Sequence, residues 1–329
     1  MKICVFGAGA VGGNFAARLA QDTRNRVCVV ARGPTLDAIR RDGITLETGG
    51  QRLTQRVIAS DRTADLGIQD LVISTVKATQ LADLARPIGP LLGPDTSVVF
   101  AQNGIPWWYL TGAPASEVPA PDLSFLDPGG ALARAIPRQS IVGAVVETAS
   151  SVIAPGVVLN SSPNHNRLLL ANIDDRPGER LDMVRQRLVD ASILSPPVPA
   201  IRRAIWQKLA ANIVTAMTIL VEEPTSSMLA DPAMRTIAES LVREVASVAA
   251  AHGIKIDPAL PNAPVGKKPS ILEDYEKRRR MEIDAQLMAP LAFARAAGLP
   301  APILNTVAAT IAHRAAARGL YEQAGVASA

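Results

Sequence analysis

The stretch MKICVFGAGAVGG (residues 1–13) decides the fold, because an apolar run breaks directly into the pattern G-x-G-x-x-G. A helical pattern follows over residues 14–20, so strand, glycine turn and helix come in the order of a dinucleotide-binding unit. Gly7 permits the tight turn, Gly9 lets the backbone approach a pyrophosphate, and Gly12 lets helix and strand pack closely. The helix N-terminus offers N–H groups and a positive dipole end to phosphates. The predicted cofactor-binding turn, against the alternative of a merely structural one, comprises Gly7, Ala8, Gly9, Ala10, Val11 and Gly12.

The residue after the second predicted strand (26–31) indicates which dinucleotide binds. An NAD-selective site usually has Asp or Glu at this point, which accepts hydrogen bonds from the ribose 2′-OH. This chain has Arg32, whose guanidinium can hold a 2′-phosphate through charge-assisted, bidentate hydrogen bonds. Arg40 and Arg41 could add to the same basic pocket or be solvated surface residues. We therefore predict NADP(H) as the cofactor.

Composition is that of a globular protein with a substantial core. The chain has 329 residues, of which 48% are hydrophobic and 19% charged, which favours two domains. The net charge of +4 is dispersed and aromatic residues make up only 3%, so no nucleic-acid partner is expected. One basic run, residues 277–280, indicates a solvated helix face or, as a second reading, a face toward an anion.

Targeting and metal signals are not evident in the sequence. The N-terminal apolar run is too short for a signal peptide, and no apolar stretch has the length and purity of a membrane helix, so no membrane partner is expected. Cys4 and Cys28 fall inside the first two predicted strands and form no disulfide framework, which fits a reducing cytoplasm. No metal site is predicted, because the three histidines match no metal-ligand spacing; they are His165, His252 and His313.

Strand signals continue through the first half of the chain. They predict a hairpin-like pair at 44–47 and 52–58 and further strands at 70–76, 97–101, 141–146, 157–159 and 167–171. A segment rich in Pro, Gly, Ala and Ser, 111–138, predicts a surface excursion.

A proline-rich stretch at 195–199 indicates a domain boundary, and the pattern beyond it is nearly all helical. The fold class is therefore α/β: an N-terminal Rossmann-type doubly wound sheet followed by an all-α C-terminal domain. We predict an NADP-binding domain over residues 1–199 and a helical substrate-binding and catalytic domain over 200–329, with the active site in the cleft between them.

Polar residues stand at the carboxyl ends of the predicted parallel strands, where ligands bind in doubly wound folds. Lys77 directly follows the strand at 70–76, and Asn103 follows the strand at 97–101. Asn-Gly is also a common turn dipeptide, so Asn103 alone would indicate a structural turn. Asn103 becomes a candidate site residue because Gly7, Arg32 and Lys77 lie at the same edge of the sheet.

The helical half contains further candidates. Lys208 and Asn212 are spaced i, i+4 and share one helix face at the margin of an apolar stripe, although such a lysine can also be a snorkelling surface residue. Ser270 and Glu273 form a capping-box pattern that predicts the start of another helix, with residues 281–284 lying within it.

At these residues the chain resembles a known family. The motifs that carry the resemblance, in order, are Gly7-Ala8-Gly9-Ala10-Val11-Gly12, Val76-Lys77-Ala78, Gln102-Asn103-Gly104, Trp206-x-Lys208-Leu209-x-x-Asn212, Lys268-Pro269-Ser270 and Glu282-Ile283-Asp284. This pattern is similar to that of the ketopantoate reductase (2-dehydropantoate 2-reductase) family, from residue 1 to about residue 310. The resemblance implies NADPH-dependent reduction of a 2-keto acid on the route to pantothenate.

The resemblance also implies residue roles. Lys208 would be the general acid that protonates the alkoxide formed by hydride transfer. Glu282 would be catalytic as well, orienting the substrate hydroxyl or the nicotinamide ribose. Substrate would be bound by Asn103, Asn212 and Ser270, and cofactor by the glycine turn together with Arg32, Lys77, Asn103 and Glu282.

Two departures from the family pattern leave the substrate open. Ala216 stands where the family commonly has an asparagine, and Leu287-Met288 replaces a common Asn-Gly pair. Three readings follow: a ketopantoate reductase, a reductase of a different 2-keto acid, and a non-catalytic NADP(H)-sensing regulator. A homodimer formed through the helical domain is a further expectation.

Overall fold

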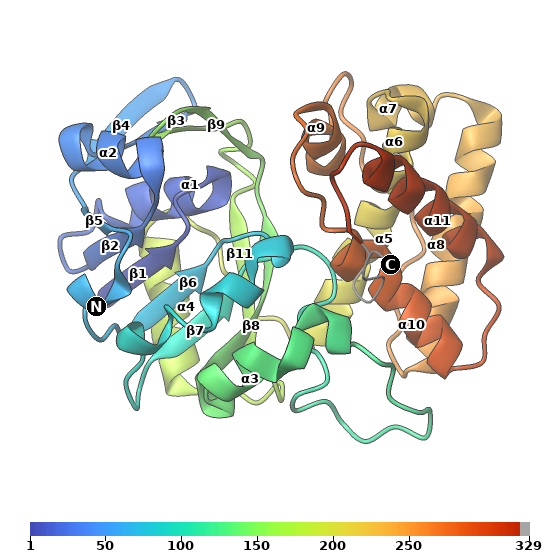
Figure 1. Cartoon of the computed structure of the whole chain (residues 1–329), viewed down its shortest axis with the longest axis horizontal. Coiled ribbons are helices and arrows are strands. Elements are labelled where there is room, and N and C mark those ends of the chain that lie inside the picture. The colour runs from blue at the N-terminus through green and yellow to red at the C-terminus, as the bar shows by residue number, and fades with distance from the viewer. Residues whose placement is uncertain (323–329) are drawn as a thin grey trace. The chain divides into compact units, whose positions relative to one another are not determined.

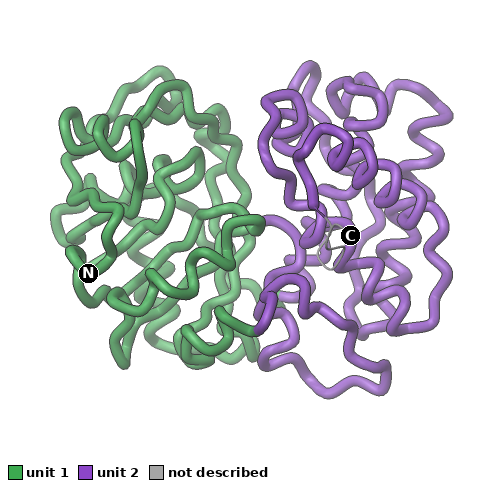
Figure 2. The backbone as a smooth tube through the Cα atoms, viewed as in Figure 1, with its two compact units in different colours: residues 1–102, 130–201 green, residues 103–129, 202–329 purple. Residues whose placement is uncertain are grey.

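The structure, a computed structural model that describes residues 1–322, contains two compact units (Figure 2). The first unit comprises residues 1–102 and 130–201, and the second comprises 103–129 with the described residues from 202 onward. Segment 103–129 thus groups with the helical half of the chain. The predicted functional division at residue 199 remains a prediction.

The first unit is built on a seven-stranded sheet (Figure 1). Its spatial order is β11-β8-β7-β6-β1-β2-β5, and all neighbouring strands are parallel except β11 and β8. Apart from β11, this is the doubly wound strand order of dinucleotide-binding folds, so the predicted fold class is confirmed. The strands are β1 (Lys2–Phe6), β2 (Arg26–Val30), β5 (Ile58–Ser60), β6 (Leu71–Ser74), β7 (Ser97–Phe100), β8 (Ile141–Glu147) and β11 (Arg167–Asn172).

A second sheet of four strands packs in the same unit. The predicted hairpin around Gly49-Gly50 is confirmed, but its second strand ends earlier than predicted and the chain re-enters the main sheet as β5. The order of this sheet is β4-β3-β10-β9, with a parallel pair at its centre. The strands are β3 (Ile44–Thr48), β4 (Gln51–Gln55), β9 (Ser150–Ala154) and β10 (Val157–Asn160). Neither β5 nor β9 is predicted by the sequence pattern.

The core of the first unit lies where α1 (Ala10–Leu19) contacts both sheets. Phe15 and Leu19 of this helix are fully buried in one apolar cluster with residues of the main sheet, the small sheet and α4 (Glu179–Asp190). Burial of such side chains stabilises the fold by about 1.5–3 kcal/mol each. The other helices of the unit are α2 (Gly33–Asp42) and α3 (Ala131–Ala135).

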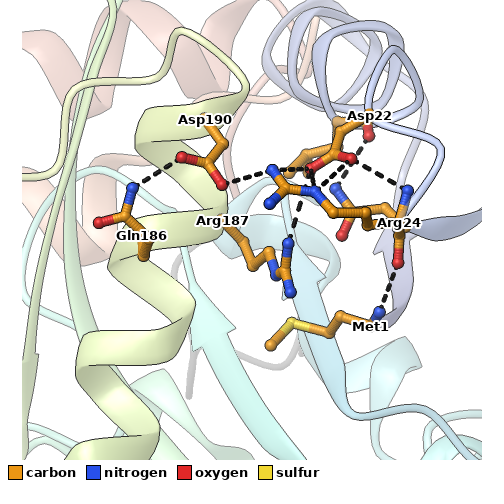
Figure 3. A network of polar contacts seen from close by, with 8 residues as sticks. Met1, Asp22, Arg24, Gln186, Arg187 and Asp190 are labelled. Carbon is orange, nitrogen blue, oxygen red and sulfur yellow. Dashed lines mark hydrogen bonds and ion pairs between the residues drawn. The ribbon is translucent and has the colours of Figure 1, made fainter.

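A polar network ties the end of α4 to the loop after α1 (Figure 3). The Arg24 guanidinium donates to Asp22 at 2.8 Å and to Asp190 at 2.7 Å, and the N-terminal ammonium of Met1 donates to the Arg24 carbonyl at 2.8 Å. The hydrogen bonds from Arg24 lower the pKa of Asp22 to about 2. The Arg24 side chain is 60% exposed, so the network orders the surface more than it stabilises the core.

In the part of the second unit that the structure describes, the regular elements are helices (Figure 1). The long helix α8 begins after Asp231, whose carboxylate accepts from two backbone N–H groups of its first turn, at 2.8 and 2.9 Å. The elements are α5 (Ile201–Ala216), α6 (Thr218–Val221), α7 (Thr225–Met228), α8 (Pro232–Ala251), α9 (Ser270–Glu276), a π-helix (Asp284–Met288), α10 (Ala289–Ala296) and α11 (Pro302–Ala317).

Segment 103–129 is held to α5 by buried polar contacts. The Arg202 guanidinium donates to the Tyr109 carbonyl, and Trp206 Nε1 donates to the Tyr109 hydroxyl at 2.7 Å. The predicted surface excursion at 111–138 is therefore only partly correct. Its last part forms α3 in the first unit, where Leu132 is fully buried.

Residues Ile201–Val221 form the one helical stretch among the described residues that could span a membrane by length and composition, with a mean hydropathy of 1.4. The expectation that no stretch would reach this length and hydropathy is thus wrong. However, 56% of the stretch is buried inside the protein. A buried core helix meets the same criterion, so the stretch alone is weak support for a membrane span.

Candidate functional site

The glycine turn of the first unit is closely packed. Gly7 follows β1 with φ of +102°, a backbone conformation that favours glycine. A Cβ atom on Gly12 would lie 1.9 Å from the Gly7 carbonyl oxygen and 2.4 Å from Thr75 Oγ1. The Thr75 hydroxyl donates to the same carbonyl at 2.6 Å. Only glycine therefore fits at position 12, and Thr75, which sequence analysis missed, holds the turn from the end of β6.

A cavity of about 260 Å³ opens at this turn and has the character of an anion site. Gly9 caps the N-terminus of α1 without a side-chain hydrogen bond, and an added Cβ at Gly9 would meet nothing within 4 Å. The cradle is thus backbone facing open space, at the positive end of a helix dipole, which fits a pyrophosphate. Lining residues include Gly7, Ala8, Gly9, Arg32, Thr35, Val76, Gln80 and Asp83.

The other predicted cofactor residues lie next to lining residues of this cavity in the chain. Ala10, Val11 and Gly12 form the first turn of α1 directly behind the lining glycines. Lys77 lies between two lining residues, Val76 and Gln80, at the start of the turn that follows β6. The first unit therefore brings the predicted turn, Arg32 and the neighbourhood of Lys77 together.

Arg32 and its two basic neighbours differ in their surroundings. Arg32 is exposed at the N-cap of α2 and lines the cavity. Arg41 instead pairs with Asp42 at 2.6 Å, and Arg40 donates to the Ala59 carbonyl at 3.1 Å. These contacts fit the reading of Arg40 and Arg41 as surface residues.

In the second unit, three predicted residues from distant parts of the sequence meet. Lys208 Nζ on α5 donates to Asn103 Oδ1 at 2.7 Å. Asn103 Nδ2 in turn faces Glu282 Oε2 at 3.5 Å. Glu282 is only 8% exposed, whereas Lys208 and Asn103 are half-buried. The carboxylate therefore lies in a largely desolvated place, where electrostatic interactions are strong, and it faces the same amide as the ammonium.

A fourth polar side chain, Gln286, joins this set and was missed by sequence analysis. Its Nε2 faces Glu282 Oε2 at 3.5 Å, and its side chain is 4% exposed. Gln286 lies four residues after Glu282, the same i, i+4 spacing that relates Lys208 to Asn212. That spacing was the signal that could have found it.

Asn103 is positioned by its neighbour Gly104. Gly104 has φ of +84°, and a Cβ atom there would lie 2.4 Å from the carbonyl oxygen of Ala285 in the π-helix. The N–H of Ile105 donates to that same oxygen at 2.8 Å. The Asn-Gly turn is thus packed directly on the π-helix, an element that occurs frequently at functional sites.

The predicted single helix from residue 270 through Glu282 is wrong. Helix α9 ends at Glu276, because Arg278 takes a left-handed conformation with φ of +51°. The N–H of Met281 then donates to the carbonyl of Leu320 at 3.0 Å. The π-helix that follows is therefore a separate element and does not continue α9.

The predicted capping box is also wrong. Pro269 is the N-cap of α9, and Ser270 is an exposed first-turn residue in a helix without a side-chain cap. The missing cap removes the structural explanation for Ser270, and its role in substrate binding stays a prediction.

The remaining predicted positions lie on the same elements. Asn212 is half-buried on α5, one turn after Lys208. Ala216 and Leu287 are both fully buried, whereas Met288 is half-buried. Ala216 and Leu287, two of the residues that depart from the family pattern, are therefore not exposed to solvent.

Asp284, the last residue of the Glu-Ile-Asp motif, serves a local contact. The Tyr321 hydroxyl donates to Asp284 Oδ1 at 2.6 Å, which ties residue 321 to the π-helix. Burial raises the pKa of Asp284 above its ordinary value. No group of three or more His, Cys, Asp or Glu side chains that could hold a metal occurs within residues 1–322.

Both halves of the chain match models of one protein family. Residues 3–107 match the family described as ketopantoate reductase PanE/ApbA, and residues 200–315 match the C-terminal family of the same name. A 2-dehydropantoate 2-reductase of Mesorhizobium japonicum is 35% identical over 328 residues, covering 98% of this chain and 100% of that protein.

Solved structures agree as well. A protein of Ralstonia solanacearum MolK2 described as a ketopantoate reductase has a TM-score of 0.85 at 32% identity, with 97% of this chain and 99% of that chain covered. D-mandelate dehydrogenase, solved with NADH and anilino(oxo)acetate, has a TM-score of 0.79 at 19% identity over 98% of this chain and 100% of its own, a likeness of fold alone. On the two family matches and the full-length relative, this chain belongs to the ketopantoate reductase family.

Proposed function

We propose that the protein is a 2-dehydropantoate 2-reductase that uses NADPH to reduce the keto group of 2-dehydropantoate to the hydroxyl of pantoate. The observation that carries the proposal is the 2.7 Å hydrogen bond from Lys208 Nζ to Asn103 Oδ1, with the Glu282 carboxylate beside the same amide. A relative of the same family, 35% identical and covered over its full length, has this activity in its name. Pantothenate biosynthesis is the pathway that this reaction would serve.

The first unit would hold the cofactor. The N–H groups at the N-terminus of α1 would bind the pyrophosphate, because the glycine turn leaves open space there. Arg32 and the Thr35 hydroxyl, which line the same cavity, would bind the 2′-phosphate of NADPH. NADPH, when bound, supplies the hydride for the keto carbon.

Lys208 would act as the general acid. Its ammonium protonates the alkoxide oxygen of the reduced substrate, and a positively charged donor in a desolvated place also stabilises that oxygen before the proton moves. Asn103 Oδ1 orients the ammonium through its hydrogen bond. The amide nitrogen of Asn103 faces Glu282. The Asn103 amide would therefore set the distance between the Lys208 ammonium and the Glu282 carboxylate.

Glu282 would accept a hydrogen bond from the substrate hydroxyl or from the nicotinamide ribose. The amides of Asn103 and Gln286, each 3.5 Å from Glu282 Oε2, would hold the carboxylate in place. Asn212 shares the α5 face of Lys208 and, with Ser270, would bind the substrate carboxylate and carbonyl oxygens. A cytoplasmic location is proposed because Cys4 and Cys28 are both free thiols, and a homodimer remains a prediction.

The direct test is NADPH oxidation by the purified full chain with 2-dehydropantoate beside smaller and bulkier 2-keto acids. We expect kcat/KM for 2-dehydropantoate of about 10⁴ M⁻¹s⁻¹ or more. Turnover confined to another 2-keto acid would favour the reading of changed specificity. NADPH binding without turnover of any substrate would favour a sensing regulator.

Cofactor choice has its own test. Arg32→Ala removes a charge-assisted contact with the 2′-phosphate, so the Kd for NADPH should rise about 10- to 100-fold while the Kd for NADH changes little. Arg41→Ala is the matched control, because Arg41 pairs with Asp42 on the same helix. Equal weakening of both cofactors by Arg32→Ala would refute the 2′-phosphate role.

A further inference from the structure

Two cysteines lie side by side in the first unit, on the strands that lead to the cofactor cavity. Cys4 in β1 and Cys28 in β2 are register partners, with exposures of 0% and 4%. Neighbouring strands lie about 4.8 Å apart, which falls in the Cα separation of about 4.4–6.8 Å that a disulfide requires. Both side chains point to the same face of the sheet, because the two residues are register partners on parallel strands. A bond between them also requires their Cβ atoms to come within about 3.5–4.5 Å of each other.

A second cavity gives Cys28 access to small molecules. It has a volume of about 100 Å³ and is lined by Cys28 and Gln69, with Lys2 and Arg26 at the first residues of β1 and β2. This volume can hold a molecule of the size of water or peroxide. Because the cavity lies at the start of these strands, it is separate from the cofactor cavity, which lies beyond their ends.

The two thiols differ in access, which assigns them different roles: Cys28 lines the second cavity, whereas Cys4 is fully buried. Interaction with the neighbouring Cys4 thiol lowers the pKa of Cys28, burial opposes this, and the charge of Arg26 adds a smaller lowering effect. Interaction with the Cys28 thiol, together with burial, raises the pKa of Cys4. As a thiol, Cys28 also donates to Gln69 Oε1 at 3.5 Å, and this contact favours the protonated form. The charged residues that line the cavity beside Cys28 are Lys2, Arg26 and Asp65, so its surroundings carry a net positive charge, as those of reactive cysteines do, and Cys4 is placed as a resolving thiol.

We propose that Cys28 and Cys4 form a peroxide-reactive dithiol, a modification site separate from the proposed reductase chemistry. The Cys28 thiolate attacks one oxygen of hydrogen peroxide, the O–O bond breaks, and hydroxide leaves, so that Cys28 becomes a sulfenic acid. The Cys4 sulfur then attacks the Cys28 sulfur, its proton goes to the departing hydroxyl, and water leaves. Two thiols are oxidised to one disulfide, and one peroxide is reduced to water.

The test treats the folded full chain with hydrogen peroxide and counts thiols by alkylation and intact mass. Both thiols should disappear together from a monomeric chain, with the mass lower by two hydrogen atoms, and dithiothreitol should restore them. Two unreacted thiols in folded protein, or a disulfide between two chains on a non-reducing gel, would overturn the proposal. This experiment needs no variant, so a folding defect cannot obscure it.

Variants then separate the two roles. Cys4→Ser should stop at a Cys28 sulfenic acid that dimedone labels, whereas Cys28→Ser should give no label at Cys4. Arg26→Gln should shift the pH midpoint of the peroxide reaction to higher pH. Arg86→Gln, an exposed arginine of the same unit, is the control and should leave that midpoint unchanged. Equal labelling of both single-cysteine variants would contradict the assignment of nucleophile and resolving thiol.

Discussion

The glycine turn of the first unit and the Lys208–Asn103–Glu282 set of the second are built in opposite ways. The turn consists of six consecutive residues, and its chemistry is that of the backbone. The polar set draws on residues 103, 208 and 282, and its chemistry is that of side chains. A contiguous backbone site follows from local conformation, whereas a dispersed site exists only when packing brings its members together. The two should therefore respond differently to substitution.

Loss of the general acid should have the largest effect. Lys208→Ala removes the proposed proton donor, so kcat should fall about 10²- to 10⁴-fold. The Kd for NADPH should change little, because it depends mainly on the glycine turn and Arg32 of the first unit. Lys267→Ala, at an exposed lysine of the second unit, is the control. Steady-state kinetics and fluorescence titration with NADPH measure the two quantities. An unchanged kcat would remove Lys208 from the mechanism.

The glycine turn offers a test in which stability and binding separate. Gly12→Ala places a Cβ 1.9 Å from the Gly7 carbonyl, so α1 must move and the free energy of unfolding should fall by about 1–3 kcal/mol or more. Gly9→Ala meets nothing within 4 Å, so its stability should stay near that of the wild type while NADPH binding weakens. Urea unfolding and NADPH titration distinguish them, and equal stability losses in both would contradict this account of the turn.

The polar set depends on a glycine in a different way. Gly104→Ala combines positive φ with a Cβ that would lie 2.4 Å from the Ala285 carbonyl, so Asn103 should shift and kcat should fall. Gly298→Ala is the matched control, because its φ is +63° and its Cβ would meet nothing within 4 Å. The control should cost about 1–2 kcal/mol of stability through backbone strain and leave kcat unchanged. Equal kcat values in both variants would count against the role of the turn.

The smallest effect is expected away from both sites, in the network around Arg24. The pKa of Asp22 is about 2 in the folded protein, against an ordinary value of 3.8. Its contribution to stability is therefore fully present above 3.8 and is lost as the pH falls through about 2.

Asp22→Asn should lower the urea midpoint slightly at neutral pH, and this difference should shrink as the pH falls below 3.8, with kcat unchanged throughout. Asp61→Asn, at an exposed carboxylate of the same unit, is the control. A difference that grows in acid would reverse the assigned sign.

Much of the fold could be predicted from the sequence, and the exceptions have physical reasons. The central strands were found because they are continuous apolar runs bounded by turn residues. The edge strand β5 and the half-exposed β9 were missed, since three to five residues with mixed polarity carry little signal. The end of α9 was missed because it depends on a left-handed Arg278, a conformation that residue type does not announce.

In the candidate site too, residues in local patterns could be predicted, whereas residues that act through distant contacts could not. Gly7, Gly12 and Arg32 could be named from spacing, because turn, helix start and strand end are local features. Thr75 and Gln286 could not, because their importance lies in contacts with Gly7 and Glu282 that form only in the folded chain. Helix spacing singled out Lys208, and the family resemblance supplied its role together with Glu282. The separation of these two residues in sequence conceals their common neighbour Asn103.

The sequence by itself determined the dinucleotide-binding unit, since a strand, a glycine turn and a helix are specified by residues that follow one another directly. It also determined which strand end carries the basic residue Arg32. Only the tertiary structure decided that Asn103 lies between Lys208 and Glu282, and that the Asn-Gly turn packs on the π-helix. The physical reason is range: backbone conformation is set by neighbours in the chain, whereas side-chain contacts across more than a hundred residues depend on how the helices pack.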